Sequence, residues 1–148
     1  MGEVAEIGAL EADLTGFTGV AVAPVSVAAG FPSPAQDYFT GRVDLNKHLI
    51  KDITCTFLVR VAGHSMEGAG ISDGDEVLVD RSLTPVDGDI VVAVIDGDMT
   101  IKRLRLDHGR VRLAAENAGY PDIVISELSE LSVWGVVTLC LHHVYRRQ

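Results

Sequence analysis

The chain has 148 residues, of which 47% are hydrophobic and 22% charged, and its formal net charge is −9 at pH 7. This length suffices for one domain with its own core and an additional arm. The negative charge argues against a broad basic face that neutralises phosphates, so direct binding of duplex DNA is not expected. No apolar run is long enough to cross a bilayer, and the two cysteines do not suggest a disulfide framework. We therefore expect a cytoplasmic protein.

The first 29 residues differ in charge from the rest of the chain. They hold four acidic residues and no Lys, Arg or His. This segment is rich in Ala, Val and Gly and weakly patterned, so a flexible N-terminal arm without a core of its own is predicted for residues 1–29. The small residues that end it resemble the end of a secretory signal peptide, but such a peptide opens with positive charge. A signal peptide is therefore not expected.

Residues 30–50 are predicted to form a linker with a short helix. Ser33 and Pro34 suit an N-cap and a first helical position before "PAQDYF", and "DLNKHLI" can add another turn or two. From residue 51 onward, short apolar runs bounded by Gly, Pro, Asp or Asn predict strands. These runs are "CTFLVRVA", "EVLVD", "DIVVAVI", "MTIKRLRL", "RVRLAA", "DIVI" and "LSVWGVVTLCLHHV".

The clearest local connection is the pair Asp96 and Gly97 inside "DIVVAVIDGDMTIKRL". Two residues of this kind between β-rich runs are the strongest short-range signal of a hairpin. The fold class is therefore predicted to be mostly β, with small, strongly curved antiparallel sheets in residues 51–148 and one short helix. The last run is a long apolar strand whose edge, if open, would pair with another chain, so a homodimer is predicted.

Ser65 is a candidate nucleophile because it lies in a glycine-rich turn, "VAGHSMEGAG". Glycines allow the close backbone approach that a serine needs if its hydroxyl and nearby N–H groups are to face a carbonyl. Two known serine signatures fail, since G-x-S-x-G would need glycine in place of Glu67 and S-x-x-K would need lysine in place of Gly68. His64 is not expected to act as the base, because neighbours on an extended chain point apart.

Lys102 is a better candidate base because of strand parity. One face of "MTIKRLRL" carries Lys102 together with Thr100, Leu104 and Leu106, and the other carries Ile101, Arg103 and Arg105. A lysine pressed against an apolar face loses hydration, its pKa falls, and it can then be neutral and accept a proton. The alternative is that its stem lies along the leucines while the amine stays in water.

Several motifs together resemble the LexA/UmuD family of self-cleaving serine peptidases. They are "AAGFPSP", "DLNKHLI", "VAGHSM", "GISDGDEVLVD", "GDIVVAVIDGDMTIKRL" and "ENAGY", in order and with similar spacing over residues 28–144. The lack of a helix-turn-helix arm places the resemblance on the UmuD side of the family. It implies a peptidase fold of the LexA C-terminal type, a scissile bond between Ala29 and Gly30, Ser65 as nucleophile and Lys102 as base. It also implies oxyanion binding by the backbone N–H groups of Ser65 and Met66, with no cofactor or metal.

The same resemblance implies a function in the SOS response to DNA damage. A RecA filament on single-stranded DNA would promote self-cleavage, which removes residues 1–29. The shortened homodimer, held by a peptidase and dimerisation domain at residues 51–148, would serve as accessory subunit of an error-prone translesion polymerase. The absence of charge from residues 17–34 fits this function, because a segment that enters its own active site is better uncharged.

Two alternatives to self-cleavage remain open on the sequence. One is a non-enzymatic accessory or dimerisation module with the same fold. The other is a relative of signal peptidases, which also use a Ser-Lys pair, although here the membrane anchor is missing and Glu67 replaces the usual proline. Neither of two further clusters predicts a metal site. Asp73, Asp75 and Asp80 lack the EF-hand spacing, and adjacent His142 and His143 would face opposite ways on a strand.

Overall fold

The computed structural model describes residues 3–6, 19–23, 26–27, 29–31, 41–126 and 130–145. The chain divides into two compact units. The larger comprises Met1–Gly8 and Thr54–Gln148, and the smaller Ala9–Ile53. In the described part of the chain, no helix has the length and apolar character needed to span a membrane.

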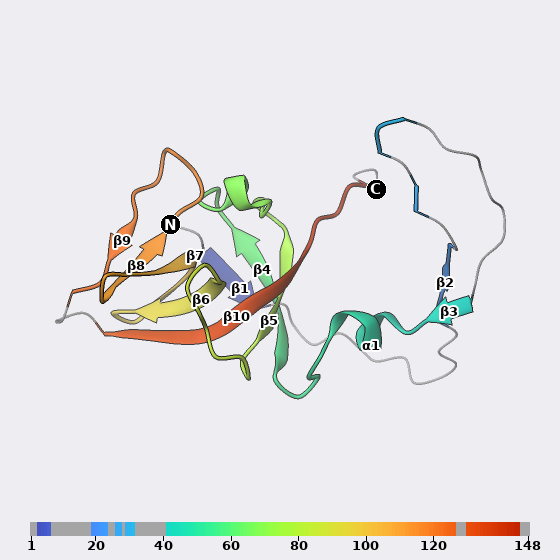
Figure 1. Cartoon of the computed structure of the whole chain (residues 1–148), viewed down its shortest axis with the longest axis horizontal. Coiled ribbons are helices and arrows are strands. Elements are labelled where there is room, and N and C mark those ends of the chain that lie inside the picture. Colours follow the sequence, from blue (N-terminus) through green and yellow to red (C-terminus); the bar gives the residue numbers. More distant parts are fainter. Residues whose placement is uncertain are drawn as a thin grey trace. The chain divides into compact units, whose positions relative to one another are not determined.

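The larger unit is built on one eight-stranded sheet (Figure 1). Every strand pair in it is antiparallel, which confirms the predicted mostly-β class. In spatial order, the strands are β1 (Glu3–Glu6), β4 (Thr56–Ala62), β5 (Glu76–Asp80), β10 (Leu131–Leu141), β6 (Ile90–Ile95), β7 (Asp98–Asp107), β8 (Arg110–Ala114) and β9 (Ile123–Val124). A 3₁₀ turn, η1 (Glu67–Ala69), lies between β4 and β5.

The smaller unit contains a two-stranded sheet and a short helix. Strand β2 (Val20–Val22) pairs with β3 (Gly41–Val43), and α1 spans Leu45–Leu49. The side chain of Asp44 caps the helix by accepting hydrogen bonds from the two N–H groups that follow Leu45. This confirms the helical turn expected in "DLNKHLI", whereas the helix expected in "PAQDYF" lies outside the described residues.

The hairpin between β6 and β7 sets the position of Lys102. Asp96 and Gly97 have φ angles of 48° and 87°, which is the left-handed conformation that a two-residue hairpin turn requires. Asn, Asp and Gly adopt that conformation most easily. The turn fixes the register of the two strands, so that Lys102 lies opposite Val91 in the middle of the ladder.

The first hydrophobic core cluster connects the sheet to the turn after β4. It joins buried side chains of four strands to Met66 and Ile71, on either side of η1. Its buried members are Val59, Val61, Met66, Ile71, Val77, Val79, Val92 and Ile101. The turn that carries Ser65 is therefore anchored in the same core as the strand that carries Lys102.

Three strands separate β4 from β7 in the order of the sheet. Four steps of about 4.8 Å would put the two strands roughly 19 Å apart in a flat sheet. Instead β1, which pairs with β4, also lies against β7. The sheet therefore bends until its β1–β4 side returns toward β7.

Strand β10, the long apolar run near the C-terminus, pairs with two neighbouring strands. Its first half pairs with β6 and its second half with β5, so it lies inside the sheet. Among the described residues, Val136 alone pairs with both neighbours, so residues 131–135 have a strand partner only on the β6 side and residues 137–141 only on the β5 side. Each half of the strand therefore keeps one side of its main chain without a strand partner among the described residues, so pairing of this strand with a second copy stays a prediction.

Candidate active site

The turn after β4 presents Ser65. The segment that follows β8 is hydrogen-bonded to this turn through its backbone. The Glu116 N–H donates to the Ser65 carbonyl at 2.8 Å, and the Gly68 N–H donates to the Glu116 carbonyl at 2.7 Å. Asn117 Nδ2 donates to the His64 carbonyl at 2.8 Å. A Cβ added at Gly68 would lie 2.5 Å from the Glu116 carbonyl oxygen, so this close approach requires glycine.

Ser65 and Lys102 meet in the interior of the larger unit. Lys102 Nζ lies 3.1 Å from Ser65 Oγ, and both residues are 2% exposed. Nζ also donates to Thr100 Oγ1 at 2.9 Å and to the Ile101 carbonyl at 3.1 Å. Lys102 is thus buried and hydrogen-bonded to the serine, so the alternative in which its amine stays in water is wrong.

The surroundings of Lys102 disfavour the charged form of its amine. Burial lowers the pKa of Lys102 below its ordinary value. None of the ion pairs in the described residues involves this lysine, so no carboxylate offsets the loss of hydration. A neutral amine has two N–H donors and one lone pair. With the N–H groups held by Thr100 and Ile101, the lone pair is left to face the Ser65 hydroxyl.

The backbone N–H groups of Ser65 and Met66 are available at the same turn. Among the described residues, neither group donates to a protein acceptor. The next N–H groups along the chain are occupied, since Glu67 donates to the His64 carbonyl at 3.4 Å and Ala69 to the Met66 carbonyl at 3.0 Å. Free N–H donors beside a serine hydroxyl can bind the oxyanion that forms when that hydroxyl attacks a carbonyl.

His64 takes no part in the contact between Ser65 and Lys102. Its imidazole is exposed and pairs with the Glu67 carboxylate three residues on. The sequence interpretation, which set His64 aside as a base, agrees with this geometry. Thr100, which contacts Lys102 Nζ, was predicted to lie on the same strand face as the lysine but was given no role. Its position two residues before Lys102 on one strand was the signal that could have indicated this contact.

The expected scissile pair belongs to the smaller unit. Ala29 and Gly30 form an exposed bend there, and Phe31 after them is 92% exposed. A Cβ built at Gly30 meets no atom within 4 Å, so this conformation does not itself demand glycine. An exposed, uncharged segment of this kind is accessible to a peptidase.

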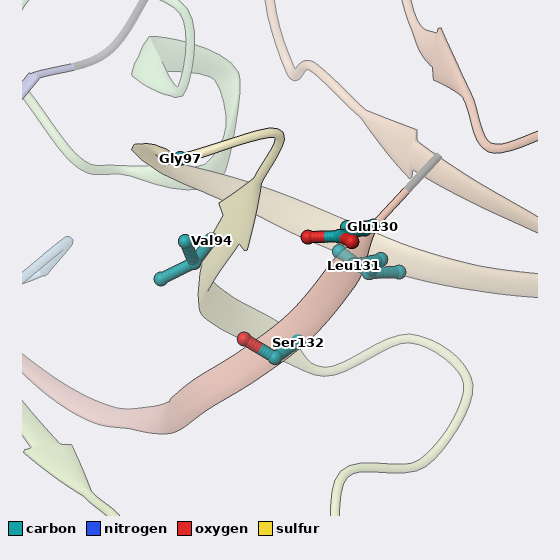
Figure 2. A pocket seen from close by; sticks show the side chains of 5 residues that line it. All are labelled: Val94, Gly97, Glu130, Leu131 and Ser132. Carbon is teal, nitrogen blue, oxygen red and sulfur yellow. The ribbon is translucent and has the colours of Figure 1, made fainter. Parts of the chain in front are cut away.

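A surface hollow of about 460 Å³ lies at another part of the larger unit (Figure 2). It is lined by Val94, Gly97, Glu130, Leu131 and Ser132, from the end of β6, the β6–β7 turn and the start of β10. This lining shares no residue with the group around Ser65, and it offers one carboxylate without a neighbouring base. The hollow therefore has no evident catalytic chemistry.

Comparison with known proteins identifies the family. Residues 21–138 match the family model described as Peptidase S24-like. The chain belongs to this family. It is 44% identical to Protein SamA of Salmonella typhimurium over 77% of this chain and 79% of SamA, and 43% identical to Protein MucA of Escherichia coli over 76% of this chain and 77% of MucA. It is also 38% identical to the LexA repressor of Oleidesulfovibrio alaskensis, over 76% of this chain and 54% of the repressor.

These likenesses confirm the predicted resemblance to the LexA/UmuD family. They support a self-cleaving peptidase of the SOS response and mutagenesis as the class of protein. The matched residues of the S24-like peptidase model include both Ser65 and Lys102. The buried contact between these two side chains therefore lies within the part of the chain that matches the family.

Proposed function

We propose that this S24-like peptidase cuts its own chain between Ala29 and Gly30, with Ser65 as nucleophile and Lys102 as general base. The observation that carries the proposal is the 3.1 Å contact between Lys102 Nζ and Ser65 Oγ in a buried site. A buried amine without a carboxylate partner costs stability. In a module used only for binding, a buried lysine beside a serine hydroxyl would lower the stability without a benefit to function.

The reaction follows from the hydrogen bonds of the lysine. Neutral Lys102 takes the proton of the Ser65 hydroxyl as Oγ attacks the Ala29 carbonyl carbon. The N–H groups of Ser65 and Met66 bind the negative charge that develops on the carbonyl oxygen. The C–N bond then breaks, Lys102 returns its proton to the amine of Gly30, and an ester remains between Ala29 and Ser65. Water, deprotonated by Lys102, hydrolyses this ester and frees the serine.

The substrate segment suits such a site in its composition. Residues 17–34 carry no charge, and small side chains at Ala29 and Gly30 let the backbone approach the nucleophile closely. Because substrate and catalyst share one chain or one dimer, the scissile bond is presented at high effective concentration. The cut separates residues 1–29, and the part that remains contains a linker at residues 30–50 and the peptidase domain at residues 51–148.

Mass spectrometry of the purified chain after incubation tests the proposal. A fragment that starts at Gly30 is expected, and Ser65→Ala and Lys102→Ala should each abolish it. Arg105→Ala is the matched control, because Arg105 lies on the opposite face of the same strand from Lys102. Cleavage at another bond, or unchanged cleavage by Lys102→Ala, would contradict the mechanism.

The resemblance to the LexA/UmuD family extends the proposal to partners. A RecA filament on single-stranded DNA would promote the cut, and the shortened form would act as accessory subunit of a translesion polymerase in the cytoplasm. We also propose a homodimer. The stretch 137–141 of β10, paired on one side only among the described residues, is a main-chain edge on which a second copy can pair.

A further inference from the structure

A buried carboxylate connects the turn that carries Ser65 to the end of β10. Asp75 is 3% exposed and lies just before β5. Its Oδ2 accepts hydrogen bonds from the Ser72 N–H at 2.8 Å and from Cys140 Sγ at 3.3 Å. Its Oδ1 lies 2.6 Å from His142 Nδ1. Three groups, the most distant of them 67 residues from Asp75 in sequence, thus converge on one side chain.

Two of these groups, Ser72 and Cys140, connect Asp75 to the segment that follows the nucleophile. Cys140 Sγ lies 3.8 Å from the carbonyl of Gly70, the residue that ends η1. The N–H of the next residue, Ile71, donates to the Met66 carbonyl at 3.2 Å. Two hydrogen-bonded steps therefore lead from Asp75, through residues 70–72, to the carbonyl of Met66, the residue that follows Ser65.

The hydrogen-bond donors around Asp75 stabilise its ionised carboxylate. Burial alone raises the pKa of this carboxyl, but the hydrogen bonds from Ser72, His142 and Cys140 together lower it below its ordinary value. Burial and the neighbouring carboxylate raise the pKa of Cys140 to about 11, so its thiol keeps its proton and remains a donor. A buried carboxylate is costly without such partners, so loss of one donor should disturb the others.

His142 is the member of this group that reaches solvent, and its neighbour provides an internal comparison. The side chain of His142 is 43% exposed. His143 follows it directly, but its imidazole is more exposed and pairs with Glu76 rather than with Asp75. The two histidines therefore have similar chemistry and different connections to the turn.

We infer that Asp75, Cys140 and His142 form a positioning cluster that holds the turn carrying the Ser65 and Met66 N–H groups in the geometry needed for cleavage. The inference rests on the proposed function of Ser65. The three residues do not touch the reacting atoms; they act through Gly70, Ile71 and Ser72. The second half of β10 thereby serves the active site as well as the sheet.

The test compares three variants of the full chain: His142→Ala, His142→Gln and His143→Ala. Cleavage is followed by mass spectrometry across a pH series, with folding checked by circular dichroism. Removal of one oxyanion donor outright costs about 10²–10³-fold in rate, so loosening the turn in His142→Ala should lower the plateau rate by about tenfold. His142→Gln keeps an N–H donor for Asp75 and should restore most of the rate, while His143→Ala should cleave as the unchanged chain does.

The pH profile separates positioning from general loosening of the fold. In the positioning account the plateau falls in His142→Ala, while the midpoint set by Lys102 stays in place. If the substitution instead admits water to the core, the pKa of Lys102 rises toward its ordinary value and the midpoint moves upward. An upward shift, equal rates in all variants, or a similar loss in His143→Ala would overturn the inference.

A second measurement keeps the inference distinct from the proposed function. In an amide NMR spectrum of the Ser65→Ala chain, adding His142→Ala should shift the Met66 N–H signal, and adding His143→Ala should not. If the unchanged chain never cleaves at any pH, the proposed function is wrong. The Met66 signal then still decides whether the cluster holds the turn, and an unmoved signal would overturn that part too.

Discussion

Replacing Thr100 by valine removes one hydrogen-bond acceptor from Lys102 while conserving shape. Thr100 is fully buried and its Oγ1 lies 2.9 Å from Nζ, so water cannot easily replace the lost oxygen. Leaving a buried donor without a partner costs about 1–3 kcal/mol. The lone pair of the neutral lysine faces Ser65 only when both of its N–H groups are hydrogen-bonded. The lost hydrogen bond therefore destabilises the arrangement of Lys102 and Ser65 from which the reaction starts. With tenfold in rate for each ~1.4 kcal/mol, the plateau rate of self-cleavage should fall by about 5- to 150-fold.

The same substitution should move the pH dependence in a defined direction. Thr100 accepts an N–H in both protonation states of Lys102, but the bond from the ammonium is the stronger one. Its removal therefore penalises the charged form more, and the pKa of Lys102 falls further. The midpoint of the pH–rate curve should move to lower pH while the plateau drops.

The assay is the yield of the Gly30 fragment over time in buffers of increasing pH. Thr100→Ser keeps the hydroxyl and should retain most of the activity. Thr138→Val makes the same chemical change at an exposed position of β10 and should leave the cleavage rate and midpoint unchanged. A midpoint that moves upward, or an unchanged plateau in a folded Thr100→Val chain, would refute the assigned role of Thr100.

Three other outcomes are expected. Lys102→Met, made in a Ser65→Ala chain, should raise Tm at neutral pH. That gain should shrink as pH rises from the folded-state pKa of Lys102 to its ordinary value. In this pH range the lysine is protonated mainly in the unfolded chain, so the stability of the Lys102 chain rises with pH while that of the methionine variant does not. A pH-independent difference in Tm would contradict the lowered pKa. Gly68→Ala places a Cβ 2.5 Å from the Glu116 carbonyl oxygen, so it should lower the free energy of unfolding by about 1–3 kcal/mol in a denaturant titration and slow cleavage. Gly119→Ala, whose added Cβ has its nearest contact at 3.7 Å, should change neither. The chain should sediment as a homodimer, and a monomer at every concentration would contradict the proposed pairing of β10.

Much of the larger unit could be predicted because its strands are apolar runs between turn residues. Asp96 and Gly97 marked a two-residue turn, and strand alternation then placed Thr100 and Lys102 on one face. Alternation alone could not say how deeply the lysine is buried. Leu106 on the same face is 45% exposed, because β7 leaves the core at its end, whereas Lys102 lies where the strand is covered on both faces.

Contacts between distant segments could not be predicted in the same way. Ser65 and Lys102 are 37 residues apart, and their contact depends on how the sheet bends, which no local pattern records. The cluster around Asp75 joins residues from two strand ends, and the sequence pattern raised that aspartate only as a possible metal ligand. Strand β1 went unrecognised because "EVAE" is short and acidic and pairs through its main chain.

The pairing of β1 with β4 bears on the fate of residues 1–29 after the proposed cut. Strand β1 is held by main-chain hydrogen bonds along residues 59–62, far in sequence from the bond between Ala29 and Gly30. Hydrolysis of that bond breaks none of them. The severed piece would then remain as a non-covalent ligand with its own dissociation rate, and dilution or a competing strand, rather than the chemistry at Ser65, would set when it departs. A denaturing gel would count such a chain as cut while size-exclusion chromatography still found both pieces together.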